Sequence, residues 1–364
     1  MKTASLTAVV LLMMWSTGLK AIETNVSTDD RLRMIDELFH DYDQANAPGA
    51  SVMVIRNGKI LLAKSYGLAD VENKIPAAPD TDFRLASVTK QFTAMAVMIL
   101  ADEGKLSLGD PITKFFPEFP DYGRGITLRH LLHHTSGLLD YEDLIPPGTT
   151  IPVLDINALR LLATQNKTYF PPGAKFRYSN TGFAFLALIV EKVSGQTFAA
   201  FLRKNIFQPL GMKQTLAYEA QISTVPNRAF GYSKKDAGFV RTDQSLTSSV
   251  LGDGGVYSSV NDLFKWDQAL YGEKLVSRKM LREAFTPGEA TLHDEGVGYG
   301  FGWFISDYRG LKNIWHSGNT VGFSTRIERF PEKKFTVIIL TNRNNAKIGE
   351  IPRRIADMYL FAGK

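Results

Sequence analysis

Residues 83–104 read FRLASVTKQFTAMAVMILADEG and join an extended lead-in to a largely apolar helix, predicted over residues 88–103 and closed by Gly104. Ser87 and Lys90 stand at the start of this helix, three residues apart. That spacing places both functional groups on one helix face, one turn apart. A helix this apolar is expected to be buried, and a buried lysine needs a reason. The segment therefore predicts a serine activated by a neighbouring lysine.

The chemistry of this pair is nucleophilic catalysis. Serine is a poor nucleophile until a neighbouring group takes its proton, which a desolvated lysine can do. Backbone amides at the helix start, including that of Ser87, can stabilise an oxyanion formed during acyl transfer. The pair alone is weak evidence, because a chain of this length is expected to contain one such spacing by chance. A capped helix with a surface lysine is the alternative.

Strand-forming sequences lie at both ends of the chain, around a helical middle. Residues 50–55 and 60–66 flank Arg56-Asn57-Gly58-Lys59, where Asn-Gly provides the positive backbone angles of a tight hairpin. Later strands are predicted over residues 300–306, 312–316, 322–330 and 335–341, and further helices over residues 29–46, 128–135, 181–194, 260–270 and 348–361. This order predicts an α+β fold: one antiparallel sheet built from N- and C-terminal segments and flanked by helices, with an inserted, mainly helical subdomain.

The predicted organisation has three parts. Residues 1–21 contain Lys2, an apolar run and small residues up to Ala21, as in a secretory signal peptide. A membrane anchor is the alternative, but about 10 apolar residues fall short of the roughly 20 that span a bilayer. We expect an exported protein, periplasmic or secreted. Residues 22–80 with 290–364 form the predicted sheet subdomain and residues 81–289 the helical one, with the active site in the cleft between them.

Composition excludes several classes of function. The 364 residues contain no cysteine, which excludes disulfides, a thiol nucleophile, a thiolate metal site and a cysteine-anchored lipoprotein. Of the 42 basic residues, Lys2 and Lys20 lie in the predicted signal peptide, which leaves 40 against 37 acidic residues. These charges are scattered along the chain, so they give little support for nucleic-acid binding.

Tyr178-Ser179-Asn180 directly precedes the predicted helix 181–194. A phenolic oxygen can shuttle protons, and an asparagine offers both a donor and an acceptor to an amide substrate. The alternative is a helix N-cap formed by Ser179 or Asn180, with Tyr178 packing nearby.

His316-Ser317-Gly318-Asn319 stands at the end of the apolar strand predicted over residues 312–316. Glycine lets a ligand approach the backbone, and an edge strand can offer amides to a carbonyl oxygen. The alternative is a loop histidine beside a turn glycine.

Taken together and in this order, the three segments resemble the serine β-lactamase and penicillin-binding protein superfamily, specifically its class C branch with related D-Ala-D-Ala carboxypeptidases and esterases. His316-Ser317-Gly318 stands where many members have Lys-Thr-Gly. Residues 126–137 and 254–259 also look like the family, and the resemblance runs from about residue 50 to residue 341.

The resemblance implies a role for each group. Ser87 is acylated, Lys90 helps to deprotonate it, and Tyr178 relays the proton to the leaving group. The substrate contacts Asn180, His316, Ser317 and Gly318, and the backbone amides of Ser87 and Asn319 form the oxyanion hole. A small molecule or a cell-wall peptide is the implied substrate, with no cofactor, metal, nucleic acid or obligate protein partner.

The predicted function is a serine acyl hydrolase that acts through an acyl-enzyme on amide or ester bonds, of the D-Ala-D-Ala peptidase or β-lactam type. His316 departs from the lysine that helps β-lactamases to bind the substrate carboxylate, because histidine supplies a weaker, pH-dependent charge. A carboxylesterase of the same superfamily is therefore an alternative. A second alternative is a receptor that is acylated by penicillin without turnover.

Other enzyme classes lack their motifs. His130, His133 and His134 are close in sequence, but no His-Glu-x-x-His is present, which favours a role in helix packing. The chain has no Gly-x-Ser-x-Gly elbow of an α/β-hydrolase. The glycines of residues 296–300 lack the spacing and the following helix of a dinucleotide site.

Overall fold

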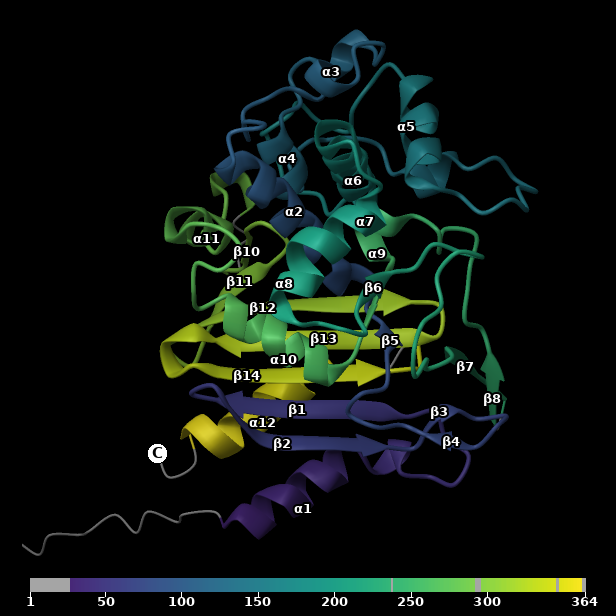
Figure 1. Cartoon of the computed structure of the whole chain (residues 1–364), viewed down its shortest axis with the longest axis vertical. Coiled ribbons are helices and arrows are strands. Elements are labelled where there is room, and N and C mark those ends of the chain that lie inside the picture. Colours follow the sequence, from purple (N-terminus) through teal and green to yellow (C-terminus); the bar gives the residue numbers. More distant parts are fainter. Residues whose placement is uncertain (1–26, 237, 292–295, 345–346, 362–364) are drawn as a thin grey trace, which may run out of the picture.

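One seven-stranded antiparallel sheet carries the fold (Figure 1). The computed structural model describes residues 27–236, 238–291, 296–344 and 347–361. The strand order is β10-β11-β12-β13-β14-β1-β2. The bounds are β1 Ala50–Arg56, β2 Lys59–Tyr66, β10 Gly298–Tyr299, β11 Phe304–Tyr308, β12 Leu311–Thr320, β13 Phe323–Phe330 and β14 Phe335–Thr341. β1 pairs with β14 along its whole length, so both ends of the chain meet inside one sheet, as predicted.

Helices from the two ends of the chain cover one face of this sheet. They are α1 (Thr28–Leu38) and α12 (Ile351–Ala356), which continues as a wider helical turn over Asp357–Phe361. Their apolar side chains and the alternate residues of β1 and β14 form a separate core cluster, which includes Ile35, Phe39, Val52, Val54, Val337, Ile339 and Ile355. The two-residue period of β1 and β14 explains why their other side chains belong to the second core.

The second core lies between the opposite sheet face and the helical part, which stands above the sheet in Figure 1. Its helices are α2 Lys90–Asp102, α3 Ile112–Phe115, α4 Leu128–Leu132, α5 Asp155–Ala163, α6 Asn180–Ser194, α7 Phe198–Leu202, α8 Gln208–Leu210, α9 Leu251–Gly254, α10 Val260–Ala269 and α11 Arg278–Ala284. α2 is the central helix, and its residues from Lys90 to Leu100 are all buried. α2 packs against α6 and α9.

Several predicted boundaries differ from the structure; for example, the strand predicted over residues 300–306 spans Phe304–Tyr308. The first helix ends at Leu38 and is followed by a 3-10 turn, His40–Tyr42, because its C-cap Phe39 leaves the helical conformation. α10 lies against β1 and β14, although its sequence falls in the predicted helical subdomain. β12 continues to Thr320, because its pairing with β13 extends to Thr320 opposite Phe323. The predicted signal peptide, residues 1–21, lies outside the described residues.

Short strands connect the helical part to the sheet. β5 (Phe83–Arg84), β9 (Val256–Ser258) and β6 (Leu216–Ala217) form a three-stranded sheet. β3 (Leu68–Asp70) pairs with β4 (Ile75–Pro76), and β7 (Tyr232–Lys235) pairs with β8 (Gly238–Arg241). In the described part of the chain, no single helix is long and apolar enough to cross a membrane; α6 and the helical segment Phe198–Leu210 meet that test only as a pair bent by 76°.

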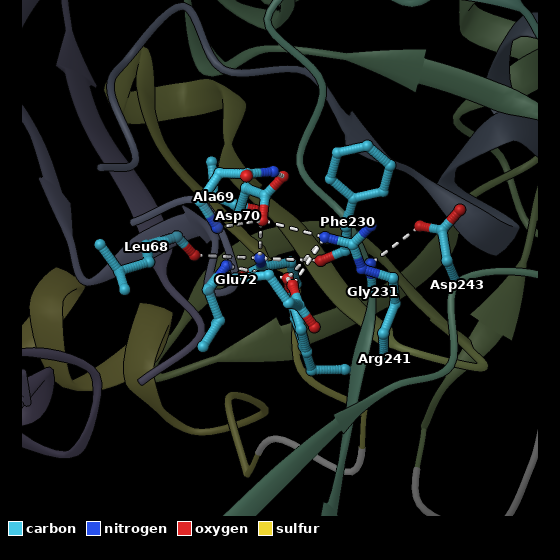
Figure 2. Close-up of polar contacts among 12 residues, drawn as sticks. Leu68, Ala69, Asp70, Glu72, Phe230, Gly231, Arg241 and Asp243 are labelled. Carbon is cyan, nitrogen blue, oxygen red and sulfur yellow. Dashed lines mark hydrogen bonds and ion pairs between the residues drawn. The ribbon is translucent and has the colours of Figure 1, made fainter. Parts of the chain in front are cut away.

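A polar network ties the β7–β8 hairpin to β3 and to the end of β14 (Figure 2). Arg241 donates through Nη2 to Asp70 Oδ1 at 2.9 Å and to Glu72 Oε2 at 2.6 Å. Asn342 donates through Nδ2 to the carbonyl oxygens of Leu68, Ala69 and Phe230. Ion pairs of Arg241 and hydrogen bonds to backbone carbonyl groups therefore anchor the β7–β8 hairpin.

Candidate active site

Ser87 lies in a 3-10 turn, Ala86–Thr89, that leads directly into α2. The preceding residue, Ala86, has φ 49°, a left-handed conformation that costs energy for a residue with a Cβ atom. Leu85 is held on both sides, because its amide donates to Val256 O at 2.8 Å and its carbonyl accepts from Thr325 Oγ1 at 2.7 Å. β9 and β13 together thus fix the turn that presents the serine.

Gly318 lets β12 pack directly on this turn. A Cβ atom at position 318 would lie 2.1 Å from Leu85 O and 2.5 Å from Thr325 Oγ1. The neighbour that a side chain here would meet is the backbone that precedes Ser87. The predicted contact of Gly318 with the substrate stays a prediction. β11 pairs with β12 only up to Trp315, so residues 316–320 form a strand edge beside the turn. The alternative of a loop histidine with a turn glycine is therefore wrong.

Lys90 is fully buried, and its ammonium nitrogen has three hydrogen-bond acceptors. Nζ donates to Ser87 Oγ at 3.1 Å, to Asn180 Oδ1 at 2.9 Å and to Asp253 O at 2.8 Å. Three acceptors match the three N–H groups of a lysine side chain. The surface-lysine alternative is therefore wrong, and Lys90 connects the serine turn with α6 and α9.

Asp253, which lies outside the three sequence motifs, contributes its backbone carbonyl through the short helix α9. Asp155 holds the start of α9, since its two carboxylate oxygens accept from Leu251 N at 2.8 Å and Gly252 N at 3.0 Å. Burial raises the pKa of Asp155 to about 7. Burial also raises the pKa of the Asp253 carboxyl to about 6, although the charge of Lys90 opposes this shift. A local signal for Asp253 is that it directly precedes residues 254–259, the stretch that resembles the family.

Tyr178 lies beside Lys90, with Lys90 Nζ 4.9 Å from the centre of its ring. Its hydroxyl oxygen is buried and has no hydrogen-bond partner among the described residues. A buried hydroxyl without a partner is costly, and a ligand can supply the missing contact. Ser179 forms the N-cap of α6, accepting from Gly182 N at 3.2 Å. The capping alternative thus holds for Ser179 and leaves the Tyr178 hydroxyl available.

Asn180 uses both ends of its amide within the site. Oδ1 accepts from Lys90, and Nδ2 donates to Glu142 Oε1 at 3.2 Å. One Nδ2 hydrogen remains for a further acceptor, because an amide group carries two. Glu142 was missed by the sequence analysis, since its contact with Asn180 joins residues that are distant in the chain.

His316 is fully buried in β12, and both ring nitrogens have partners. Nδ1 donates to Ser317 O at 2.7 Å, and Nε2 accepts from Tyr299 OH at 3.0 Å. Burial, with a smaller contribution from the nearby charge of Lys90, lowers the pKa of His316 to about 3. His316 is therefore neutral at physiological pH. The expectation that it supplies a pH-dependent charge to a substrate carboxylate is corrected accordingly.

Ser317 is half-buried and Asn319 is exposed, on the strand edge that borders the Ser87 turn. The roles of Ser317 in substrate contact, and of the Ser87 and Asn319 amides in an oxyanion hole, stay predictions. Of the three clustered histidines, His134 lies nearest the site: its ring centre is 4.3 Å from that of Tyr178, and its Nδ1 accepts from Ser179 N at 3.1 Å. No group of three or more metal-ligating side chains occurs among the described residues.

Comparison with known proteins identifies the family to which this chain is similar. A model of the Beta-lactamase family matches residues 35–358. Penicillin-binding protein 4* of Bacillus subtilis is 32% identical over 330 residues, which cover 86% of this chain and 72% of that protein.

Solved structures agree with these sequence matches. The octameric penicillin-binding protein homologue from Pyrococcus abyssi has a TM-score of 0.76 and 30% identity, covering 92% of this chain and 76% of that chain. D-amino acid amidase from Ochrobactrum anthropi SV3, complexed with L-phenylalanine amide, has a TM-score of 0.76 and 25% identity, covering 92% and 98%. The chain therefore belongs to the Beta-lactamase family, with the β-lactamase/transpeptidase-like fold, and is a serine acyl hydrolase of that family.

Proposed function

We propose that the protein hydrolyses amide and ester bonds through an acyl-enzyme on Ser87. The observation that carries this proposal is the 3.1 Å contact between Lys90 Nζ and Ser87 Oγ at a buried helix start. This distance lies within the range over which a proton is transferred directly between side chains.

In the first step, Ser87 Oγ attacks the substrate carbonyl while Lys90, acting in its neutral amine form, takes the hydroxyl proton and passes it by way of Tyr178 to the leaving amine or alcohol. A C–O bond to Ser87 forms, and the bond to the leaving amine or alcohol breaks. Tyr178 supports this step, because its unpartnered hydroxyl can relay a proton to the leaving group. Water then attacks the acyl-enzyme, which releases the carboxylic acid and returns the proton to Ser87.

The neutral His316 favours substrates that do not depend on a free carboxylate. A carboxylate gains most from a cation such as lysine or arginine, and His316 offers neither a charge nor a free ring nitrogen. We therefore place amide and ester hydrolysis ahead of β-lactam hydrolysis or D-Ala-D-Ala cleavage. The likeness to an amidase structure supports this order.

The test is a burst experiment with p-nitrophenyl acetate and intact-protein mass spectrometry. We expect a burst equal to the enzyme concentration, an acetyl adduct on Ser87 and steady release afterwards. Ser87→Ala should abolish both the burst and the adduct, whereas Ser107→Ala, at an exposed turn, should retain both. Wild-type protein that yields neither burst nor adduct would refute the proposal.

The same experiment separates the non-hydrolytic alternative. A penicillin receptor of the family would form the adduct without steady release, whereas a hydrolase turns over. We also propose export with cleavage near Ala21, which the N-terminal mass of the protein recovered from its native host would test.

A further inference from the structure

Among the described residues near Ser87, the exposed carboxylate of Glu142 has no counterion. Lys90 directs its N–H groups at three acceptors, and Arg177 forms an ion pair with Asp140 at 3.0 Å. Glu142 is exposed, and within the described residues it has no ion-pair partner. A substrate that enters this site therefore meets an uncompensated negative charge.

One side chain, that of Asn180, connects Glu142 with the catalytic groups. It accepts from Asn180 Nδ2 at 3.2 Å, and Asn180 Oδ1 accepts from Lys90 Nζ at 2.9 Å. Lys90 in turn contacts Ser87 Oγ. A substrate acyl group that uses the remaining Asn180 hydrogen lies next to the Glu142 carboxylate.

The turn that carries Glu142 is firmly held. It is the 3-10 segment Tyr141–Leu144, whose first residue is buried. Tyr141 N donates to Thr181 Oγ1 at 2.9 Å, and Tyr141 OH donates to Asp253 Oδ2 at 3.0 Å. The carboxylate is thus mounted on the same elements, α6 and α9, that hold Lys90, which is what a specificity residue requires.

We infer that Glu142 binds an ammonium group on the acyl part of the substrate, and that the enzyme prefers amides and esters of amino acids or peptides with a free amine. This inference rests on the proposed acyl-enzyme function of Ser87. Hydrogen bonds between ionised partners are roughly twice as strong as neutral ones, so a free amine gains more at Glu142 than an acylated one. A substrate with a free carboxylate at the same place is repelled.

The test compares alanine p-nitroanilide with N-acetylalanine p-nitroanilide, each as both enantiomers. For the preferred enantiomer, we expect wild-type kcat/KM to be at least about tenfold higher for the free amine. Glu142→Gln keeps an oxygen acceptor for Asn180 but removes the charge. It should lower kcat/KM about tenfold for the free amine and less than about threefold for the N-acetyl substrate. Asp143→Asn, in the same turn, is the matched control and should change neither.

The pH and salt dependence give an independent readout. An α-amine loses its proton near pH 8, so the wild-type preference should decline above that pH and also with rising salt. In Glu142→Gln, the preference for the free amine should depend less on pH and less on salt. An equal loss on both substrates would make Glu142 a positioning residue for Asn180 and overturn the inference, as would a wild-type preference for the N-acetyl substrate. Failure of p-nitrophenyl acetate to acylate Ser87 would instead refute the underlying function.

Discussion

Lys90 at the start of α2 and Asp82 just before β5 are near each other in sequence and equally buried, yet their surroundings are opposite. Lys90 has three acceptors, contributed by the serine turn, α6 and α9. Both carboxylate oxygens of Asp82 lack a hydrogen-bond partner within the described residues. Burial, with smaller contributions from the charges of Asp262 and Asp80, raises the pKa of Asp82 to about 9.

This difference shows that the polar partners of a buried ionisable group, and not burial alone, decide its protonation state. A buried charge is tolerated where polar partners replace water, whereas a buried acid without partners must be protonated. The partners of Lys90 are arranged around the nucleophile Ser87. The energetic cost of burying the lysine charge is therefore linked to function. Asp82 lies outside that arrangement, so its burial is expected to act on stability alone.

The largest effect is expected from Lys90→Met, which keeps the length of the side chain and removes its charge. We expect kcat/KM for p-nitrophenyl acetate to fall by at least about 10³-fold, as when a residue of a catalytic unit is lost. Stability should fall by about 1–3 kcal/mol, because the Asn180 and Asp253 oxygens lose a donor. Lys105→Met, at a half-exposed lysine, is the control. Full activity in Lys90→Met would show that Lys90, like Asp82, is not required for catalysis.

Asp82→Asn should raise stability at neutral pH and leave activity unchanged. The folded-state pKa of about 9 lies above the ordinary value of 3.8, so the folded protein holds a proton that the unfolded chain releases. Stability from this group is therefore complete below about pH 4 and is lost as pH rises toward 9. At pH 7 the gain in the free energy of unfolding should be about 2–4 kcal/mol, and it should vanish near pH 4. Urea denaturation at both pH values measures it, and a pH-independent gain would contradict the assignment.

Tyr299→Phe addresses a third buried group, His316, which is neutral but fully partnered. Loss of the hydroxyl removes the donor to His316 Nε2 and should cost about 1 kcal/mol in thermal or urea unfolding. Hydrolysis of p-nitrophenyl acetate should stay within about threefold of wild type, because His316 carries no charge to the substrate. A large, pH-dependent loss of activity would show that the ring takes part in proton transfer.

The smallest effect is expected from Arg241→Gln in the network of Figure 2. Its ion pairs with Asp70 and Glu72 are partly exposed, so we expect a loss of less than about 1 kcal/mol that shrinks in high salt. Activity should remain at the wild-type level. A stability loss as large as that of Lys90→Met would mean that this network contributes as much to the stability of the fold as the contacts of Lys90 do.

Local periodicity was sufficient to predict the fold class and the place of the Ser87–Lys90 pair. The two-residue period of strands and the 3.6-residue period of helices depend on neighbouring residues only, so the hairpin of β1 and β2 and the apolar helix α2 were readable. Helix geometry also places a serine and a lysine three residues apart on one face, whatever the rest of the chain does.

Only the tertiary structure decided which atoms surround that pair. The Asp253 carbonyl, the Glu142 contact to Asn180, the neutral His316 and the packing of Gly318 on Leu85 all join residues far apart in the chain. Their positions follow from the packing of α6, α9 and β12 around the start of α2, where burial sets both the available partners and the preferred protonation states. No local pattern contains that information, because distance through space is independent of separation along the sequence.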